Sequence, residues 1–230
     1  MTPLRRRGLK ERGEPKITDR LQVYNTALLL CGERSLGSLT EDREPRRNLD
    51  QAWNGGAVDK CLEEGQWRFA MRTVQIDSDP SIAPDFGYRN AFNKPEDWVV
   101  TSAVCEEEYF RTPLTAYTDE ADCWFSDLDT IYVKYVSNDV LWGMNIGKWP
   151  QAFADFVSAH LASRIIIKLS ESEEKMKAIM GLREKFKREA KNAAAMSEPT
   201  RFAARGTWSR ARTKGSKRSD GGNINGNLIG

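Results

Sequence analysis

The chain has 230 residues, of which 40% are hydrophobic and 30% charged, with a formal net charge of +2. This length suits one large domain or a core with an insertion, and the hydrophobic fraction is sufficient for a buried core. No apolar run approaches the roughly 20 residues that cross a bilayer, and residues 1–16 lack the apolar stretch of a signal peptide. We therefore expect a globular protein without a membrane partner, made and assembled in the cytosol.

The charge is unevenly distributed along the chain. Residues 1–20 carry seven cations and three acids, and residues 201–230 carry seven cations and one acid. Because the whole chain has a charge of +2, residues 21–200 together carry −8. An acidic body with basic ends is typical of a protein that uses its ends as interaction arms.

Two helices are predicted in the first third of the chain. Thr18-Asp19 can cap a first helix, and Gly32 stands where a left-handed C-terminal cap is expected. Apolar residues at helical spacing predict a second helix over residues 45–65. Its weak points are Gly55 and Gly56, because each glycine costs about 1 kcal/mol relative to alanine in a helix interior.

The middle third has short apolar or alternating runs separated by proline, glycine and aspartate, a pattern that predicts a small antiparallel β domain. The predicted strands are Trp67–Ile76, Trp98–Cys105, Tyr109–Tyr117, Cys123–Phe125 and Ile131–Val136. The segment Ser78–Pro95 is expected to be a long irregular excursion, and loops of that size are usually functional or packed against a neighbour.

Helical periodicity returns at Trp149 and Pro150, with the proline in the tolerated first turn. This third helix is apolar on nearly all sides, so it must be buried on several sides. A fourth helix, roughly residues 172–195, has one apolar stripe and one face of paired charges.

These patterns predict an α+β fold: a helical bundle of two N-terminal and two C-terminal helices, with an inserted antiparallel β domain and an extended C-terminal arm. The predicted segments are a basic N-terminal extension (1–16), the first part of the helical domain (17–66), the β domain with long loops (67–148), the second part of the helical domain (149–196) and the basic arm (197–230).

The arm cannot fold by itself. Residues 201–218 contain seven cations, no acid and two aromatic residues, and a glycine- and asparagine-rich stretch follows. Such a segment buries too little apolar surface to offset about 1–2 kcal/mol of backbone ordering per residue. We therefore expect it to lie on a partner. The expected contact residues are Arg201, Phe202, Arg205, Trp208, Arg210, Arg212, Lys214, Lys217, Arg218, Leu228 and Ile229.

Two partners suit this composition, and a solvated tail is the alternative to both. Arginine and lysine interleaved with aromatic rings suit phosphates and base stacking. They also suit an acidic protein groove, with Phe202 and Trp208 as anchors. The apolar pair Leu228 and Ile229 favours the protein partner over bare DNA.

Catalytic chemistry has little support in the sequence. His160, the single histidine, lies among apolar residues of the third helix and is expected to be a packed residue rather than a base. The sequence contains no phosphate-binding glycine motif. The four cysteines are scattered without metal-ligand spacing, so buried reduced thiols are expected. We predict no catalytic, cofactor or metal site.

Acidic clusters occur at Glu106–Glu108 and at Asp119, Glu120 and Asp122. A glycosidase pair would need two carboxyls about 5–9 Å apart across a cleft, and solvated strand ends explain these acids better. A further hypothesis is that these acids, together with Asp127 and Asp129, form an acidic collar that repels DNA along a channel.

Several short motifs, in their order and spacing, make the chain resemble the head-to-tail adaptors of short-tailed bacteriophages, also called tail tubular protein A. The resemblance covers about residues 17–195. The motifs are Asn25-x-x-Leu28-Leu29-x-x-Gly32, Ser38-Leu39, Trp67-x-Phe69-Ala70, Gly87-Tyr88-x-x-Ala91-Phe92-x-x-Pro95-x-Asp97, Ile131-x-Val133-x-Tyr135, Trp149-Pro150-x-x-Phe153 and Leu161-Ala162.

The resemblance implies a non-enzymatic virion protein at the head-tail connector. It implies a homo-oligomeric ring, of twelve subunits, between the portal protein and the tail nozzle protein, with genomic DNA passing through the lumen. In that setting the arm contacts the portal and the β domain faces the nozzle. The helices would pack side by side around the ring, so we expect the third helix to supply subunit packing residues. These are Phe153, Phe156, Ile165, Ile166 and Ile167.

Two other functions stay open. One is an adaptor with peptidoglycan hydrolase activity, and the other is a DNA-binding protein that uses its basic termini.

Overall fold

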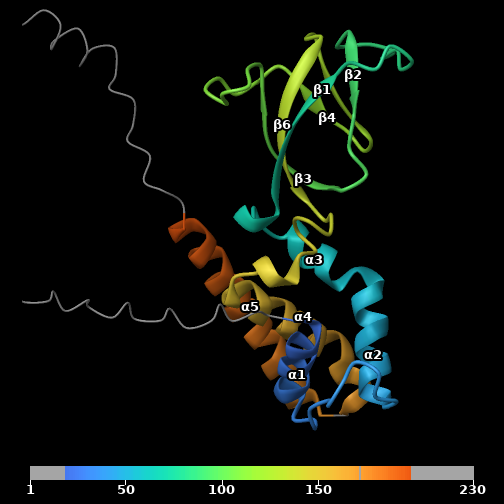
Figure 1. Ribbon diagram of the computed structural model, residues 1–230, viewed down its shortest axis with the longest axis vertical. Helices are drawn as coiled ribbons and strands as arrows, with labels where there is room; N and C mark the ends of the chain where they lie inside the picture. The colour runs from blue at the N-terminus through green and yellow to red at the C-terminus, as the bar shows by residue number, and fades with distance from the viewer. Residues whose placement is uncertain (1–18, 171, 198–230) are drawn as a thin grey trace, which may run out of the picture. The chain divides into compact units, whose positions relative to one another are not determined.

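The computed structural model describes residues 19–170 and 172–197, which form a mixed α+β structure (Figure 1). The α+β class predicted from the sequence is therefore confirmed. The helices are α1 (Arg20–Cys31), α2 (Glu44–Ala52), α3 (Val58–Glu63), α4 (Gln151–Leu169) and α5 (Glu173–Met196). The strands, all between α3 and α4 in the chain, are β1 (Met71–Asp77), β2 (Asn90–Asn93), β3 (Trp98–Cys105), β4 (Thr118–Asp119), β5 (Cys123–Ser126) and β6 (Thr130–Ser137).

Helix α1 begins and ends where local chemistry predicts. The Asp19 side chain accepts a hydrogen bond from the backbone N–H of Gln22 at 2.7 Å, which caps the first turn. Gly32 adopts φ 79°, and its N–H donates to carbonyls of the last turn. Both predicted ends of this helix are confirmed.

The predicted second helix is interrupted at its glycine pair. The segment Trp53–Ala57 between α2 and α3 contains non-helical backbone at Gly55 and Gly56, and Gly56 has φ 77°. Arg164 of α4 donates from Nη1 to the Gly55 carbonyl at 3.0 Å. The kink therefore frees a carbonyl from the helical ladder, and a side chain of α4 binds it.

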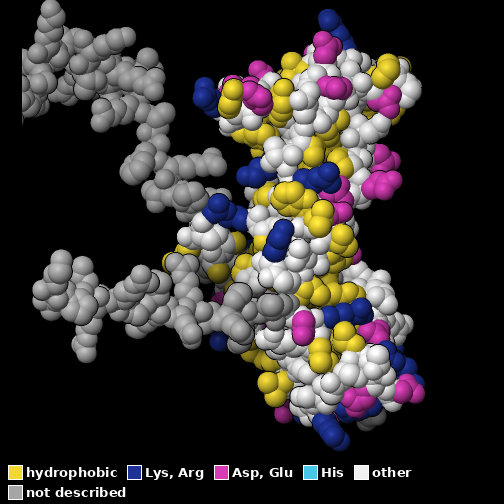
Figure 2. Space-filling model, in the orientation of Figure 1, with side chains coloured by type: hydrophobic (Ala, Val, Ile, Leu, Met, Phe, Trp, Pro, Cys, Tyr) yellow, Lys and Arg dark blue, Asp and Glu magenta, His cyan; other side chains and the backbone are white. Residues whose placement is uncertain are grey.

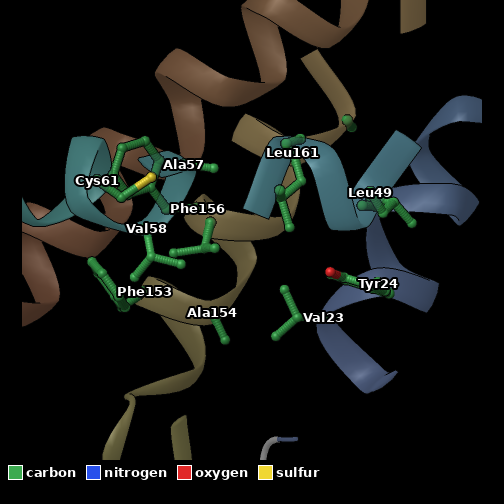
Figure 3. Close-up of a cluster of buried hydrophobic side chains, with 14 of the residues drawn as sticks. Val23, Tyr24, Leu49, Ala57, Val58, Cys61, Phe153, Ala154, Phe156 and Leu161 are labelled. Carbon is green, nitrogen blue, oxygen red and sulfur yellow. The ribbon is translucent and has the colours of Figure 1, made fainter. Parts of the chain in front are cut away.

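Helix α4 packs against α1, α2 and α5. Side chains from α1, α2, α4 and the Ala57–Cys61 segment converge in one core (Figure 3). Within it, Tyr24, Leu49, Phe156 and Leu161 are completely buried. Trp67 lies with its ring 4.8 Å from that of Phe153, so aromatic residues extend this core toward the strands.

The strands form two antiparallel sheets of three strands, in the orders β1-β6-β3 and β2-β5-β4. In β6, Ile131, Val133 and Tyr135 are buried, as the alternating pattern predicts. They meet Phe92 and Trp124 of the other sheet in a second core. The inserted strands therefore have a core of their own.

Three predictions in this region were wrong. Tyr109–Tyr117 is not a strand but a loop, apart from one bridge between Pro113 and Cys105. Trp67–Ile76 begins with a short 3-10 helix (Arg68–Ala70) rather than a strand. The predicted excursion Ser78–Pro95 contains β2, whose four residues are too few to show an alternating pattern.

Candidate interaction surfaces

The structure tests only part of the predicted contact set. The predicted arm residues, from Arg201 to Ile229, and the N-terminal extension lie outside the described residues. The five predicted packing residues of α4 lie within them. The surfaces described below therefore belong to the helices and the inserted strands.

Four of the five α4 residues are unavailable to another subunit. Phe153, Phe156, Ile165 and Ile166 are at most 2% exposed, whereas Ile167 is 62% exposed. The expectation that all five pack between subunits is thus corrected: the apolar sides of α4 are covered by α1, α2 and α5 of the same chain. Among these five residues, Ile167 alone keeps an exposed apolar surface.

Other apolar side chains are exposed at positions that the sequence pattern did not single out. On the helices these are Leu29, Met180 and Met196, and in the segment before α4 they are Val140 and Leu141. Leu29 is 74% exposed although its neighbour Leu28 is fully buried. A run of three leucines does not reveal which member faces outward. In the face shown in Figure 2, hydrophobic side chains (yellow) interrupt the polar surface over both helices and strands.

The loop between β1 and β2 presents the most exposed of these residues, Phe86, at 91%. The base of this loop is fixed, because the Asp79 carboxylate accepts hydrogen bonds from Ser81 and, at 2.6 Å, from the Asn93 amide. These bonds lower the pKa of Asp79. Gly87, at φ 89°, allows the turn that follows Phe86. The loop thus holds an aromatic ring out in solvent on an anchored base.

A hollow of about 370 Å³ lies beside this ring. Loop residues Ile82, Pro84 and Tyr88 line it together with Phe125 of β5 and the acidic residues Asp85 and Glu120. A large exposed aromatic side chain beside a hollow of mixed polar and apolar lining is typical of protein contact sites. Phe86 and most residues of this hollow belong to Ser78–Pro95, the segment that the sequence predicts to be functional or packed against a neighbour.

The inserted segment 67–148 is strongly acidic, with fourteen acids and seven cations. One acid of the predicted clusters has a structural role: Asp119 binds Lys94 at 2.6 Å and accepts hydrogen bonds from Thr101 and Trp124. The Lys94 ammonium also lies 3.7 Å from the ring centre of Trp98. Asp119 and Lys94 therefore join the two sheets, and the Asp119 carboxylate is held by three partners.

His160 is a packed residue of α4, as its apolar neighbours predict, and it is 8% exposed. Arg183 of α5 donates from Nε to His160 Nδ1 at 2.9 Å. Burial lowers the pKa of His160 to about 4, and the positive charge of Arg183 acts in the same direction. The ring is therefore neutral at neutral pH, and its Nδ1 serves as an acceptor.

The four cysteines are free and buried, which confirms the expected reduced thiols. Burial raises the pKa of Cys31 to about 11, so its thiol stays protonated at neutral pH. Across residues 19–170 and 172–197, no three histidine, cysteine or acidic side chains gather in a way that would hold a metal ion. Over the same residues, no helix is both long enough and apolar enough for a bilayer span.

Comparison with known protein families gives no match, and no curated protein matches the sequence.

Proposed function

We propose that this chain is a structural head-to-tail adaptor of a short-tailed bacteriophage. In this proposal, copies of the chain form a ring in the virion that joins the portal to the tail nozzle and surrounds the exit path of the DNA. The helices form the bundle that builds the ring, the inserted strands form the domain that faces the nozzle, and the arm contacts the portal. The resemblance over residues 17–195 is the starting point.

The structural roles of the motif residues support this proposal. The Asn25 side chain binds both backbone groups of Leu36, at 2.8 and 3.1 Å, and so fixes the segment after α1. Trp149 donates from its indole nitrogen to the Gly143 carbonyl at 2.8 Å. Asp97 binds Arg72 at 2.9 Å. These residues hold segments of the fold together. Members of a structural protein family are expected to share residues of this kind.

The observation that carries the proposal is the exposure of large apolar side chains on two separate parts of the fold. Phe86 is exposed on a loop of the inserted strands, and Leu29, Ile167 and Met180 are exposed on the helices. An adaptor needs one surface for each neighbour and further surfaces for its own copies. Each contact can be weak, because a ring repeats it many times.

The first experiment tests the arm. The full chain and a variant lacking residues 201–230 are mixed with the portal protein of the same virion, and binding is followed by sedimentation. We expect the shortened protein to keep its circular dichroism spectrum and to lose portal binding. Full retention of portal binding by the shortened protein would refute the arm contact.

The second experiment tests the loop. Phe86→Ala should leave stability and portal binding unchanged, because the ring is exposed, but should weaken attachment of the nozzle protein about tenfold or more. Met196→Ala, which removes a comparably exposed side chain from the end of α5, is the control and should not affect nozzle attachment. Equal effects of the two variants would remove the loop from the contact.

The third experiment tests the assembly. The mass and shape of the full-length protein, alone and with portal, are measured by native mass spectrometry and electron microscopy. We expect a closed ring in at least one of these conditions. A protein that stays monomeric in both conditions would contradict the adaptor function.

A further inference from the structure

A groove of about 360 Å³ lies between α2 and α4. Ala52 and Ile165 provide its apolar wall, and its other lining residues carry hydrogen-bond donors. Those residues are Asn48, Gln51, Arg164 and Lys168. The groove thus has four donor-bearing side chains and no acidic one.

The donors in this groove keep unused capacity. Arg164 uses Nη1 for the Gly55 carbonyl, and Lys168 donates to Gln51 Oε1 at 3.1 Å. Within the described ranges, no carboxylate forms an ion pair with Arg164 or Lys168. The Asn48 amide nitrogen is buried, and no described group accepts its hydrogen bond.

Neighbouring cations differ in this respect. Arg46 of α2 binds Asp50 at 2.5 Å, and Lys187 of α5 binds Glu64 at 2.5 Å. These two cations are matched by an acid of the same chain, whereas none of the described acids forms an ion pair with Arg164 or Lys168. Two cations without an acidic partner at one groove suit an oxyanion, and a carboxylate accepts hydrogen bonds from both.

We propose that this groove receives an aspartate or glutamate side chain from a second copy of the chain. The inference rests on the proposed ring, which places copies side by side. Charge complementarity supports this occupant, because residues 21–200 carry a net charge of −8 and every copy brings the same excess of acids. A single groove with two cations suits one acidic side chain better than the repeated phosphates of DNA, which need a track of cations.

An apolar contact accompanies the charged one. Arg164, Ile167 and Lys168 are spaced three and four residues apart, so they share one exposed face of α4. Ile167 is 62% exposed there. Of the residues that the sequence assigned to subunit packing, it is the one placed to meet a neighbour. A carboxylate in the groove with an apolar contact at its edge has the composition of a subunit interface.

Zero-length cross-linking tests this directly. A carbodiimide joins a lysine amine to a carboxylate that touches it, with loss of water, and leaves no spacer. Unlabelled and ¹⁵N-labelled full-length proteins are mixed, assembled and cross-linked, and the peptides are analysed by mass spectrometry. We expect Lys168 to be linked to an acidic residue in mixed-isotope peptides. Cross-links of Lys168 within one chain only, or none in assembled rings, would overturn the inference.

A variant provides the second readout. Lys168→Gln removes the charge and should raise the protein concentration at which rings dissociate about tenfold, with a smaller effect of added salt than in the unaltered protein. Lys191→Gln, at an exposed position of α5, is the matched control and should have no effect. Urea unfolding of both variants verifies that the fold is kept, since neither lysine is buried.

The outcomes separate this inference from the function on which it rests. If rings form and Lys168→Gln does not change the concentration at which they dissociate, the adaptor function is retained and the groove is excluded as an interface. A protein that forms no ring under any condition would refute the adaptor function and the inference together. Loss of duplex DNA binding in Lys168→Gln, with assembly unchanged, would assign the groove to phosphate and overturn the carboxylate proposal.

Discussion

Arg183 of α5 binds two helices at once through Glu64, the C-terminal cap residue of α3, and His160 of α4. Lys187, one turn further along α5, binds the other oxygen of Glu64 at 2.5 Å. Burial raises the pKa of Glu64, but the hydrogen bonds and charges of Lys187 and Arg183 outweigh it, so the net shift is downward. One ionic cluster therefore joins α3, α4 and α5.

Arg183→Met should lower the free energy of unfolding by about 3 kcal/mol, because it leaves Glu64 largely buried with one cation fewer. Urea denaturation followed by tryptophan fluorescence measures this loss. Lys185→Met is the control. Its weak ion pair with Glu189, at 3.9 Å, is exposed, so its removal should change stability by no more than about 0.5 kcal/mol. Similar losses in the two variants would show that the cluster contributes little.

His160 should make stability depend on pH. Its pKa is about 4 in the folded chain, against 6.5 for an ordinary histidine. The unfolded state therefore binds more protons between these values, and stability rises with pH from about 4 to 6.5 and is lost as pH falls. The loss of stability approaches about 3 kcal/mol at the acidic end, since each unit of pKa difference corresponds to about 1.36 kcal/mol.

His160→Gln isolates this contribution, because glutamine still accepts a hydrogen bond from Arg183 but does not titrate. Carboxylates titrate in the same range in both proteins, so the difference between the two stability curves reports the histidine. We expect the two curves to lie close together near pH 7 and to separate toward pH 4, where only the protein with His160 loses this stability. Curves that stay parallel would mean that His160 does not titrate differently on folding.

Local signals in the sequence predicted the parts of the fold that depend on neighbouring residues. Asp19 and Gly32 mark the ends of α1 because capping needs only the adjacent turn. The alternation in β6 predicted its buried face for the same reason. Local signals did not predict that α1, α2 and α5 of the same chain pack over the apolar sides of α4. Helical spacing shows that Ile165 and Ile167 face different directions but not which chain covers each direction.

The interaction surfaces depend on contacts between distant segments. The groove combines residues 48–52 with residues 164–168, and no spacing rule relates positions more than a hundred residues apart. The exposed ring of Phe86 was indicated only indirectly, by the length and proline content of its loop. The predicted arm followed from composition alone, and it lies outside the described residues.

The kink between α2 and α3 predicts opposite effects for two adjacent glycines. Gly56 has φ 77°, where a side chain is strained, so Gly56→Ala should cost about 1–2 kcal/mol. Gly55 has φ −80°, and an added Cβ would lie 3.7 Å from Arg164 Nη1, an ordinary contact. Gly55→Ala should therefore be neutral or stabilise by about 0.5 kcal/mol. Thermal unfolding of both variants decides this, and equal destabilisation would contradict the backbone argument.

Asp97 anchors the inserted strands at their helical end. Its carboxylate binds Arg72 of β1 and accepts hydrogen bonds from Tyr135 and Ser137 of β6. Burial opposes its ionisation, but these three partners outweigh burial and lower its pKa. The stabilisation is therefore complete above the usual pKa of aspartate and is lost as pH falls below it.

Asp97→Asn should lower the free energy of unfolding by about 2 kcal/mol at pH 7, because the half-buried carboxylate loses its charge-assisted hydrogen bonds, while its ion pair with the exposed Arg72 contributes less. Asp122→Asn, at an exposed position of the same segment, is the control and should change little. The strands and helices share core residues, since Val136 of β6 belongs to the helical core. We therefore expect one cooperative transition, shifted as a whole in urea. A separate early transition in Asp97→Asn, reported by Trp98 and Trp124, would show instead that the inserted strands unfold alone.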